Sequence, residues 1–297
     1  MNEEVVFMSE NKKDKRRSTF QIVKRRILQD KATVIGLSII SLAIIMAIFA
    51  PFISPYDPIK PNYSETLQPP SRGHLFGTDE FGRDVFSRVI YGTRYALLIG
   101  LGVVMIEAII GITAGTIAGY FGGKIDDVIM RIVDVFLSIP TIVLAIALAA
   151  ALGGGLKNVI IATGLIIWVG FARLVRGEVL KIKQEPYIEA AKAMGINDLK
   201  IIFRHVLPNA LSPIIVYTTL SMPSAILISA ALSFLGLGVQ PPTPEWGAMV
   251  SEGKALLGTA WWISAFPGLA ILMLSLAFNM VGDGLRDALD PKLGRRR

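Results

Sequence analysis

The sequence predicts an all-α membrane protein with six transmembrane helices, and two observations carry this prediction. The chain of 297 residues is 53% hydrophobic and only 18% charged, whereas soluble domains carry about 25% charged residues. Its apolar residues gather in segments near the roughly 20 residues that a helix needs to cross a bilayer. The six predicted spans are residues 32–53, 94–121, 128–152, 159–173, 211–238 and 262–285.

Pro140, Pro223 and Pro267 each fall inside one of these spans. A proline inside a helix removes one backbone hydrogen bond and bends the helix axis. We therefore expect kinked rather than straight helices, which fit a bundle that encloses a cavity but also occur in bundles that enclose none.

The basic residues predict an orientation, because Lys and Arg concentrate in cytoplasmic loops. With both termini in the cytoplasm, 23 of the 30 Lys and Arg residues lie on that side. The predicted organisation is a basic N-terminal segment (1–31), a first helix with its outer loop (32–93), a five-helix core (94–285) containing the cytoplasmic loop 174–210, and a tail (286–297). The net charge of +7 then reflects topology and attraction to membrane lipid. Nucleic acid is not an expected partner, since no motif accompanies the charge.

The residue inventory argues against catalysis by this chain. There is no Cys, and the two histidines, His74 and His205, lie in different loops, so no metal site, cofactor or catalytic residue is expected. No G-x-x-x-x-G-K-[ST] pattern is present, because Gly123-Lys124 and Gly253-Lys254 are followed by other residues. The chain therefore lacks the phosphate-binding loop of P-loop ATPases.

Two features inside the second span concern helix packing and polarity. Gly111, Gly115 and Gly119 recur every four residues, which allows close approach of a neighbouring helix. Glu107 lies near the middle of the span, where a carboxylate must face protein or water rather than lipid. It is either structural, in contact with a neighbouring helix or a partner subunit, or part of a substrate or proton route.

Local ion pairs are expected at two places. Arg131 and Asp134 lie three residues apart, so they can pair on one helix face. In the outer loop, Arg83 and Arg88 are interleaved with acidic residues such as Asp79, which indicates ion pairs rather than a metal cluster.

The loop 185–208 has the pattern of two short helices. Pro186 suits a first helical turn, and Gly195 suits a C-terminal stop. A second helix is expected over 199–206, ending before Pro208. The small residues Ala190 and Ala191 would let the first helix dock into a groove on another protein, although an ordinary amphipathic loop at the membrane surface is the alternative.

The spacing of this loop resembles the coupling motif of permease subunits in bacterial ABC importers. The residues that carry the resemblance are Glu189, Ala190, Ala191, Gly195, Leu207 and Pro208. Three further stretches resemble the peptide/nickel branch of that family, in particular its C-type subunit: GTDEFGRDVFSRVIYGTR (77–94), LSFLGLGVQPPTPEWG (232–247) and GDGLRDALDP (282–291).

The resemblance implies a type I importer permease in the cell membrane of a bacterium or archaeon. Its implied partners are a homologous second permease, two cytoplasmic ATP-binding subunits, and an extracytoplasmic substrate-binding protein. Peptides are the expected substrates, with nickel chelates or other small solutes as the alternative. From a different class, a proton-coupled secondary transporter using Glu107 would explain the acid but not the loop motif. An intramembrane hydrolase lacks the necessary residues.

Overall fold

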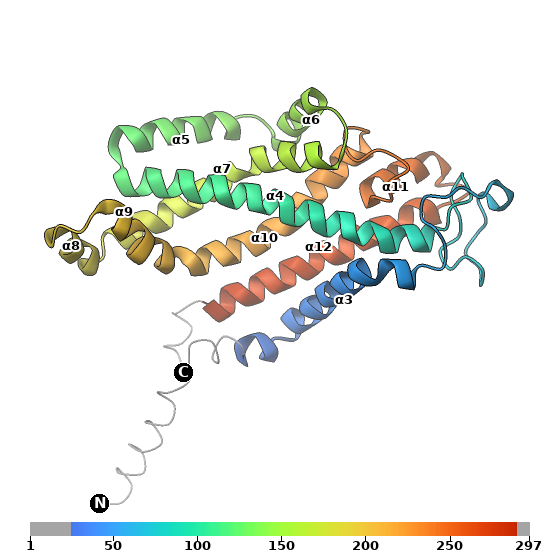
Figure 1. The fold of residues 1–297 in the computed structure, drawn as a ribbon, viewed down its shortest axis with the longest axis horizontal. Coiled ribbons are helices and arrows are strands. Elements are labelled where there is room, and N and C mark those ends of the chain that lie inside the picture. The colour runs from blue at the N-terminus through green and yellow to red at the C-terminus, as the bar shows by residue number, and fades with distance from the viewer. Residues whose placement is uncertain (1–24, 290–297) are drawn as a thin grey trace, which may run out of the picture.

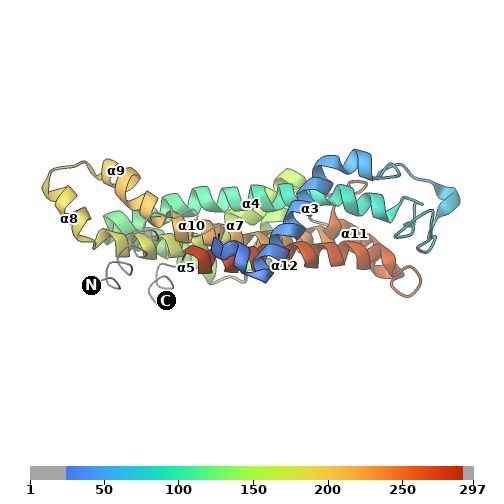
Figure 2. The ribbon, with the colours of Figure 1, turned by 90° about the horizontal axis from the view of Figure 1, so that it is seen from below.

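The computed structural model describes residues 25–289, and this part of the chain is largely helical. Predictions about residues 1–24 and 290–297 lie outside the described residues. Five helices in the described part are long and apolar enough to cross a membrane. They run roughly lengthwise through an elongated, flattened bundle (Figures 1 and 2). These helices are α3 (Lys31–Ile53), α4 (Val85–Phe121), α7 (Leu156–Lys183), α10 (Leu207–Phe234) and α12 (Trp262–Leu289).

Shorter elements lie between and beyond the long helices. They are α5 (Gly123–Leu137), α6 (Thr141–Leu152), α8 (Pro186–Ala193), α9 (Asp198–Ile201), a π-helical turn (Ile202–Val206), α11 (Trp246–Gly253) and 3₁₀ turns at Tyr63–Glu65 and Lys254–Leu256. Helices α8 and α9 lie at one end of the bundle, and α11 lies toward the opposite end with the loop that precedes α4 (Figure 1). We call these the α8 end and the α11 end.

The predicted third span, 128–152, is not one helix. Helices α5 and α6 meet at an angle of 91°, with the break at residues 138–140. Pro140 has no backbone N–H, and a proline also disfavours the helical conformation of the residue before it, Ile139. Pro140 therefore separates two helices rather than kinking one, and the bundle has a sixth candidate span only if this bent pair counts as one.

Two other helix boundaries differ from the prediction. Helix α4 begins well before residue 94, because the Asp84 carboxylate accepts hydrogen bonds at 2.7 Å from both the backbone N–H and the hydroxyl of Ser87. Such a cap satisfies backbone donors of the first turn. Helix α7 continues past residue 173 to Lys183, beyond the apolar segment.

The second short helix does not end before Pro208. Helix α9 continues through the π-helical turn into α10, so that Asp198–Phe234 forms one candidate span. Within the turn the Leu207 N–H donates to the Ile202 carbonyl, five residues back. This wider turn accommodates Pro208, which cannot donate a hydrogen bond of its own.

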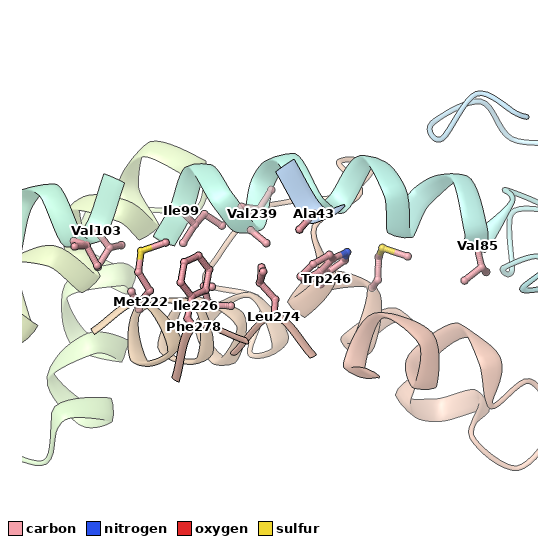
Figure 3. Close-up of a cluster of buried hydrophobic side chains, with 14 of the residues drawn as sticks. Ala43, Val85, Ile99, Val103, Met222, Ile226, Val239, Trp246, Leu274 and Phe278 are labelled. Atoms are coloured by element: carbon pink, nitrogen blue, oxygen red, sulfur yellow. The ribbon is translucent and has the colours of Figure 1, made fainter. Parts of the chain in front are cut away.

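The largest hydrophobic cluster lies where α4 faces α10, α11 and α12 (Figure 3). Its members include Val103, Met222, Trp246 and Phe278. A second cluster lies toward the α8 end and joins α7, α8, the π-helical turn and α10. The short helix α8 is therefore packed onto the bundle rather than projecting freely from it.

Candidate functional site

The loop 185–208 builds a short helix with a defined stop. Helix α8 starts at Pro186, as predicted. At its other end the Ile196 N–H donates to the Ala191 carbonyl at 3.2 Å, and Gly195 has a φ of +75°. This 6→1 hydrogen bond with a left-handed residue is a Schellman motif. The helical stop predicted at Gly195 is therefore present.

One face of α8 is turned into the chain's own core. Ile188 and Ala191 are buried, with Ala191 only 2% exposed, and they belong to the cluster that contains Val179 and Ile201. The predicted docking role of Ala191 therefore needs correction, because its side chain is covered by this chain itself. Among the other motif residues, Glu189, Ala190, Gly195 and Pro208 are exposed, so a partner can reach them.

The same segment leaves large apolar side chains uncovered. Met194 is 72% exposed and Phe203 is 69% exposed, and Tyr187 and Leu199 are also exposed. Exposed apolar groups interspersed with charged ones are typical of protein–protein contact sites. We call Tyr187, Glu189, Ala190, Met194, Leu199 and Phe203 the outer residues of the α8 segment.

Leu207 and Pro208 occupy a different setting from the rest of the motif. They form the first turn of α10 rather than the end of a short helix. The Asn209 side chain donates to the His205 carbonyl at 2.6 Å, which adds a local bond within this turn. Through Leu207 and Pro208, α9 and the π-helical turn continue into α10, so that Asp198–Phe234 is one continuous span.

The glycines predicted to promote packing lie against α7. A Cβ atom built at Gly115 would lie 2.4 Å from the carbonyl oxygen of Ala172, and one at Gly119 would lie 2.9 Å from that of Arg176. At Gly111 the nearest atoms belong to Phe171, at 3.0 Å. Any larger side chain would push α4 away from α7, so these positions set the helix separation.

Glu107 faces protein rather than lipid. It is 2% exposed, and its Oε1 accepts a hydrogen bond from the Ser221 hydroxyl of α10 at 3.1 Å. Its Oε2 has no hydrogen-bond partner among the described residues. The acid thus joins two long helices, and Ser221 is a partner that sequence reasoning did not identify.

Ion pairs fasten α5 along α7. The predicted pair of Arg131 with Asp134 is wrong, because Asp134 accepts a hydrogen bond from Arg173 of α7 at 2.6 Å. Similarly, Arg176 of α7 binds Asp126 of α5 through two hydrogen bonds of 2.5 Å. The two residues of each pair are at least 39 positions apart in the sequence. Spacing along a single helix therefore cannot predict these pairs.

The α11 end holds a buried ionic network. The ion pairs predicted for the loop before α4 are confirmed, since Asp79 lies 2.6 Å from Arg83 and 3.6 Å from Arg88. Both arginines also contact Glu252 of α11, at 3.2 and 2.9 Å. Burial raises the pKa of Glu252, although the charges of Arg88 and Arg83 oppose this shift. Glu252 lies too far along the sequence for local spacing to reveal it.

The fold matches a solved membrane transporter. The inward-facing methionine ABC transporter MetNI gives a TM-score of 0.55 at 20% identity, covering 69% of this chain and 98% of that chain. Together, the apolar helices and this likeness define the fold of a type I ABC importer permease, with five or six candidate membrane spans among the described residues.

The particular family follows from two sequence models. Residues 111–295 match the family described as binding-protein-dependent transport system inner membrane component, and residues 18–70 match the N-terminal transmembrane domain of oligopeptide transport permease C. The chain belongs to this family of bacterial inner-membrane permeases, whose members are transport subunits and not enzymes.

Curated relatives cover most of the chain. The dipeptide transport system permease protein of Alkalihalophilus pseudofirmus is 48% identical over 91% of this chain and 88% of its own length. The probable D,D-dipeptide transport permease of Escherichia coli is 46% identical, over 89% of each chain. The glutathione transport permease of Pectobacterium atrosepticum is also 46% identical, over 91% of this chain and 90% of its own.

Proposed function

We propose that this chain forms one half of the membrane pathway of an ATP-driven importer for di- or oligopeptides. The relatives that support this are named for dipeptides, D,D-dipeptides and glutathione, which is itself a short peptide. A homologous second permease would supply the other half of the pathway, and an extracytoplasmic binding protein would deliver the peptide.

In the proposed orientation the α8 end faces the cytoplasm. The stretch from α7 to the π-helical turn carries seven Lys and Arg residues between 173 and 204, as expected for a cytoplasmic loop. The loop that precedes α4 and the helix α11 would then face outward. This orientation places the outer residues of the α8 segment where a cytoplasmic ATPase can reach them.

The single observation that carries the coupling proposal is the two-sided character of α8. Its inner face, Ile188 and Ala191, is anchored in the bundle, while Glu189 and Ala190 face outward. A helix held in this way can receive a displacement from a bound subunit and pass it to the helices beneath. ATP binding and hydrolysis in two separate subunits would then bias the permease pair between inward-open and outward-open states.

Uptake by the reconstituted complex tests this function. Proteoliposomes containing the complete importer should accumulate a labelled dipeptide when the ATP-binding side is supplied with ATP, and a proton ionophore should leave the initial rate unchanged. A complex without its ATP-binding subunits is the matched control and should show no uptake. Accumulation driven by a proton gradient in the absence of ATP would contradict the proposal.

A further inference from the structure

We propose that Tyr120, the penultimate residue of α4, is the positioning residue that ties the α8 segment to the transmembrane helices. This inference rests on the proposed coupling function and adds a route by which movement leaves α8. Tyr120 is 3% exposed and belongs to the hydrophobic cluster beneath α8, together with Ile188, Ala191 and Ile201.

The hydroxyl of Tyr120 makes the first directional contact. It donates to Asp198 Oδ1 at 2.6 Å, and Asp198 is the first residue of α9. Hydrogen bonds to a carboxylate are shorter and stronger than those between neutral groups. Tyr120 is buried and Asp198 is exposed, so the bond lies at the edge of the cluster, and losing the acceptor would remove the hydroxyl's protein partner. The bond therefore fixes α9 relative to the end of α4.

Two lysines approach the ring of the same tyrosine. The Nζ atom of Lys192 in α8 lies 5.1 Å from the ring centroid, and that of Lys183, the last residue of α7, lies 5.8 Å from it. Both distances fall within the range of cation–π attraction. One side chain of α4 thus contacts the end of α7, the helix α8 and the start of α9.

These contacts differ in kind from the apolar packing under α8. Apolar burial is non-directional, so Ile188 and Ala191 anchor α8 to the bundle without fixing its orientation through specific atoms. A hydrogen bond and charge contacts to one ring add that directional constraint, because they weaken with distance and angle. A force applied to α8 is then carried to Tyr120 instead of being absorbed within the loop.

The position of Tyr120 in α4 makes it suited to pass this force onward. The preceding residue, Gly119, packs so closely on α7 that a Cβ atom added there would lie 2.9 Å from the Arg176 carbonyl oxygen. The same helix continues through Gly115 and Gly111 to Glu107, which bonds to Ser221 of α10. Displacement at Tyr120 therefore reaches α7 and α10 through closely packed helices rather than flexible loops.

The test measures how many peptides are imported for each ATP hydrolysed by the complete reconstituted importer. Tyr120→Phe keeps the ring, its burial and the lysine contacts but removes the hydroxyl. We expect the ratio to fall on the order of fivefold. A charge-assisted hydrogen bond is worth enough free energy for a roughly tenfold or greater effect, so this expected fall corresponds to loss of part of its contribution. Tyr95→Phe, at a partly exposed position on the same helix, is the matched control and should leave the ratio unchanged.

A double-mutant cycle separates coupling from simple loss of structure. Asp198→Ala should lower the ratio as Tyr120→Phe does, and the combined variant should be no worse than either single one, because both remove the same bond. The amount of ATPase subunit retained on the purified complex, and its unfolding temperature, should stay close to wild type.

The outcomes distinguish this inference from the proposed function. If Tyr120→Phe and Asp198→Ala keep both the ATPase subunits and the wild-type ratio, the tyrosine does not transmit movement and the inference fails alone. Fully additive losses would also overturn it. If the wild-type chain does not bind ATPase subunits at all, the proposed coupling function fails, and the inference falls with it.

Discussion

Arg88 and Glu252 form a buried ion pair that joins the start of α4 to α11 across 164 positions of sequence. The Arg88 guanidinium donates to Glu252 Oε2 at 2.9 Å, and the arginine is 1% exposed. The same guanidinium donates to the carbonyls of Pro58 and Pro242. A single side chain therefore holds together both loops of the α11 end.

Removing one partner of this pair should destabilise the protein. Breaking a buried ion pair leaves an uncompensated charge and costs about 3–5 kcal/mol. We expect Glu252→Ala to lower the unfolding temperature of the purified complex in detergent strongly, and Arg88→Met to do the same. Arg72→Met, at an exposed position of the same loop, is the control and should change it little. Equal unfolding temperatures for Glu252→Ala and Arg72→Met would show that the pair contributes no stability.

Glu107 is predicted to be structural and not a proton-coupling site. Glu107→Gln keeps the size of the side chain and an oxygen that can accept from Ser221, while it removes the charge. Peptide uptake should persist at a substantial level and remain dependent on ATP. Loss of uptake in a complex that assembles normally and retains its ATPase subunits would instead place Glu107 on the substrate or proton route.

Much of the helical organisation was predictable because hydropathy and length constrain a membrane helix closely. The first span agrees with α3 to within a residue. The prediction of one continuous third span was wrong because hydropathy carries no information on the direction of the chain. Residues 128–152 are apolar on both sides of Pro140, yet the chain turns there. The predicted bounds of the second and fourth spans were too short because charged residues were taken to lie outside the helices. Arg88 and Arg176 in fact lie inside α4 and α7, where ion pairs compensate their charges.

The orientation of the bundle is tested by labelling single cysteines in this cysteine-free chain. Ser64 and Asn197 are both exposed, at the α11 and α8 ends. In intact cells, a reagent that cannot cross the membrane should label Ser64→Cys and leave Asn197→Cys unlabelled until the membrane is opened. The reverse pattern would show that the α8 end faces outward, and the proposed ATPase contact would then be untenable.

The site illustrates where sequence reasoning stops. Residues three apart in a helix, such as Ile188 and Ala191, share one face, but spacing does not say whether that face meets a partner or the chain's own core. The Tyr120 contact to Asp198 joins residues 78 positions apart, and nothing in the local pattern of either residue indicates the other. Only tertiary packing reveals which face of α8 is free.

The exposed position of Ala190 makes it the better test of docking on the α8 segment. Ala190→Trp should fit the isolated chain, because its side chain points away from the core, yet it should overfill a closely matched groove at a cost of about 1–3 kcal/mol. We expect reduced retention of the ATPase subunits on purification. Ala255→Trp, at an exposed position of the α11 end, makes the same change away from the contact and should retain them. Ala191→Trp would instead disrupt the chain's own core.

Gly195 allows the backbone at the end of α8 to be tested apart from side-chain fit. A Cβ atom at this position meets nothing within 4 Å, so space is not limiting, but the φ of +75° is unfavourable for most side chains. Asn tolerates this left-handed conformation far better than a β-branched residue does. Gly195→Val should therefore disturb the Schellman stop and impair both ATPase retention and peptide uptake, while Gly195→Asn should preserve them.

Because neither change touches a membrane-spanning segment, both variants should reach the membrane in normal amounts, as quantified by immunoblotting of membrane fractions. If Gly195→Val retains its ATPase subunits and transports peptide at the wild-type rate, the geometry of the α8 stop is not needed for coupling.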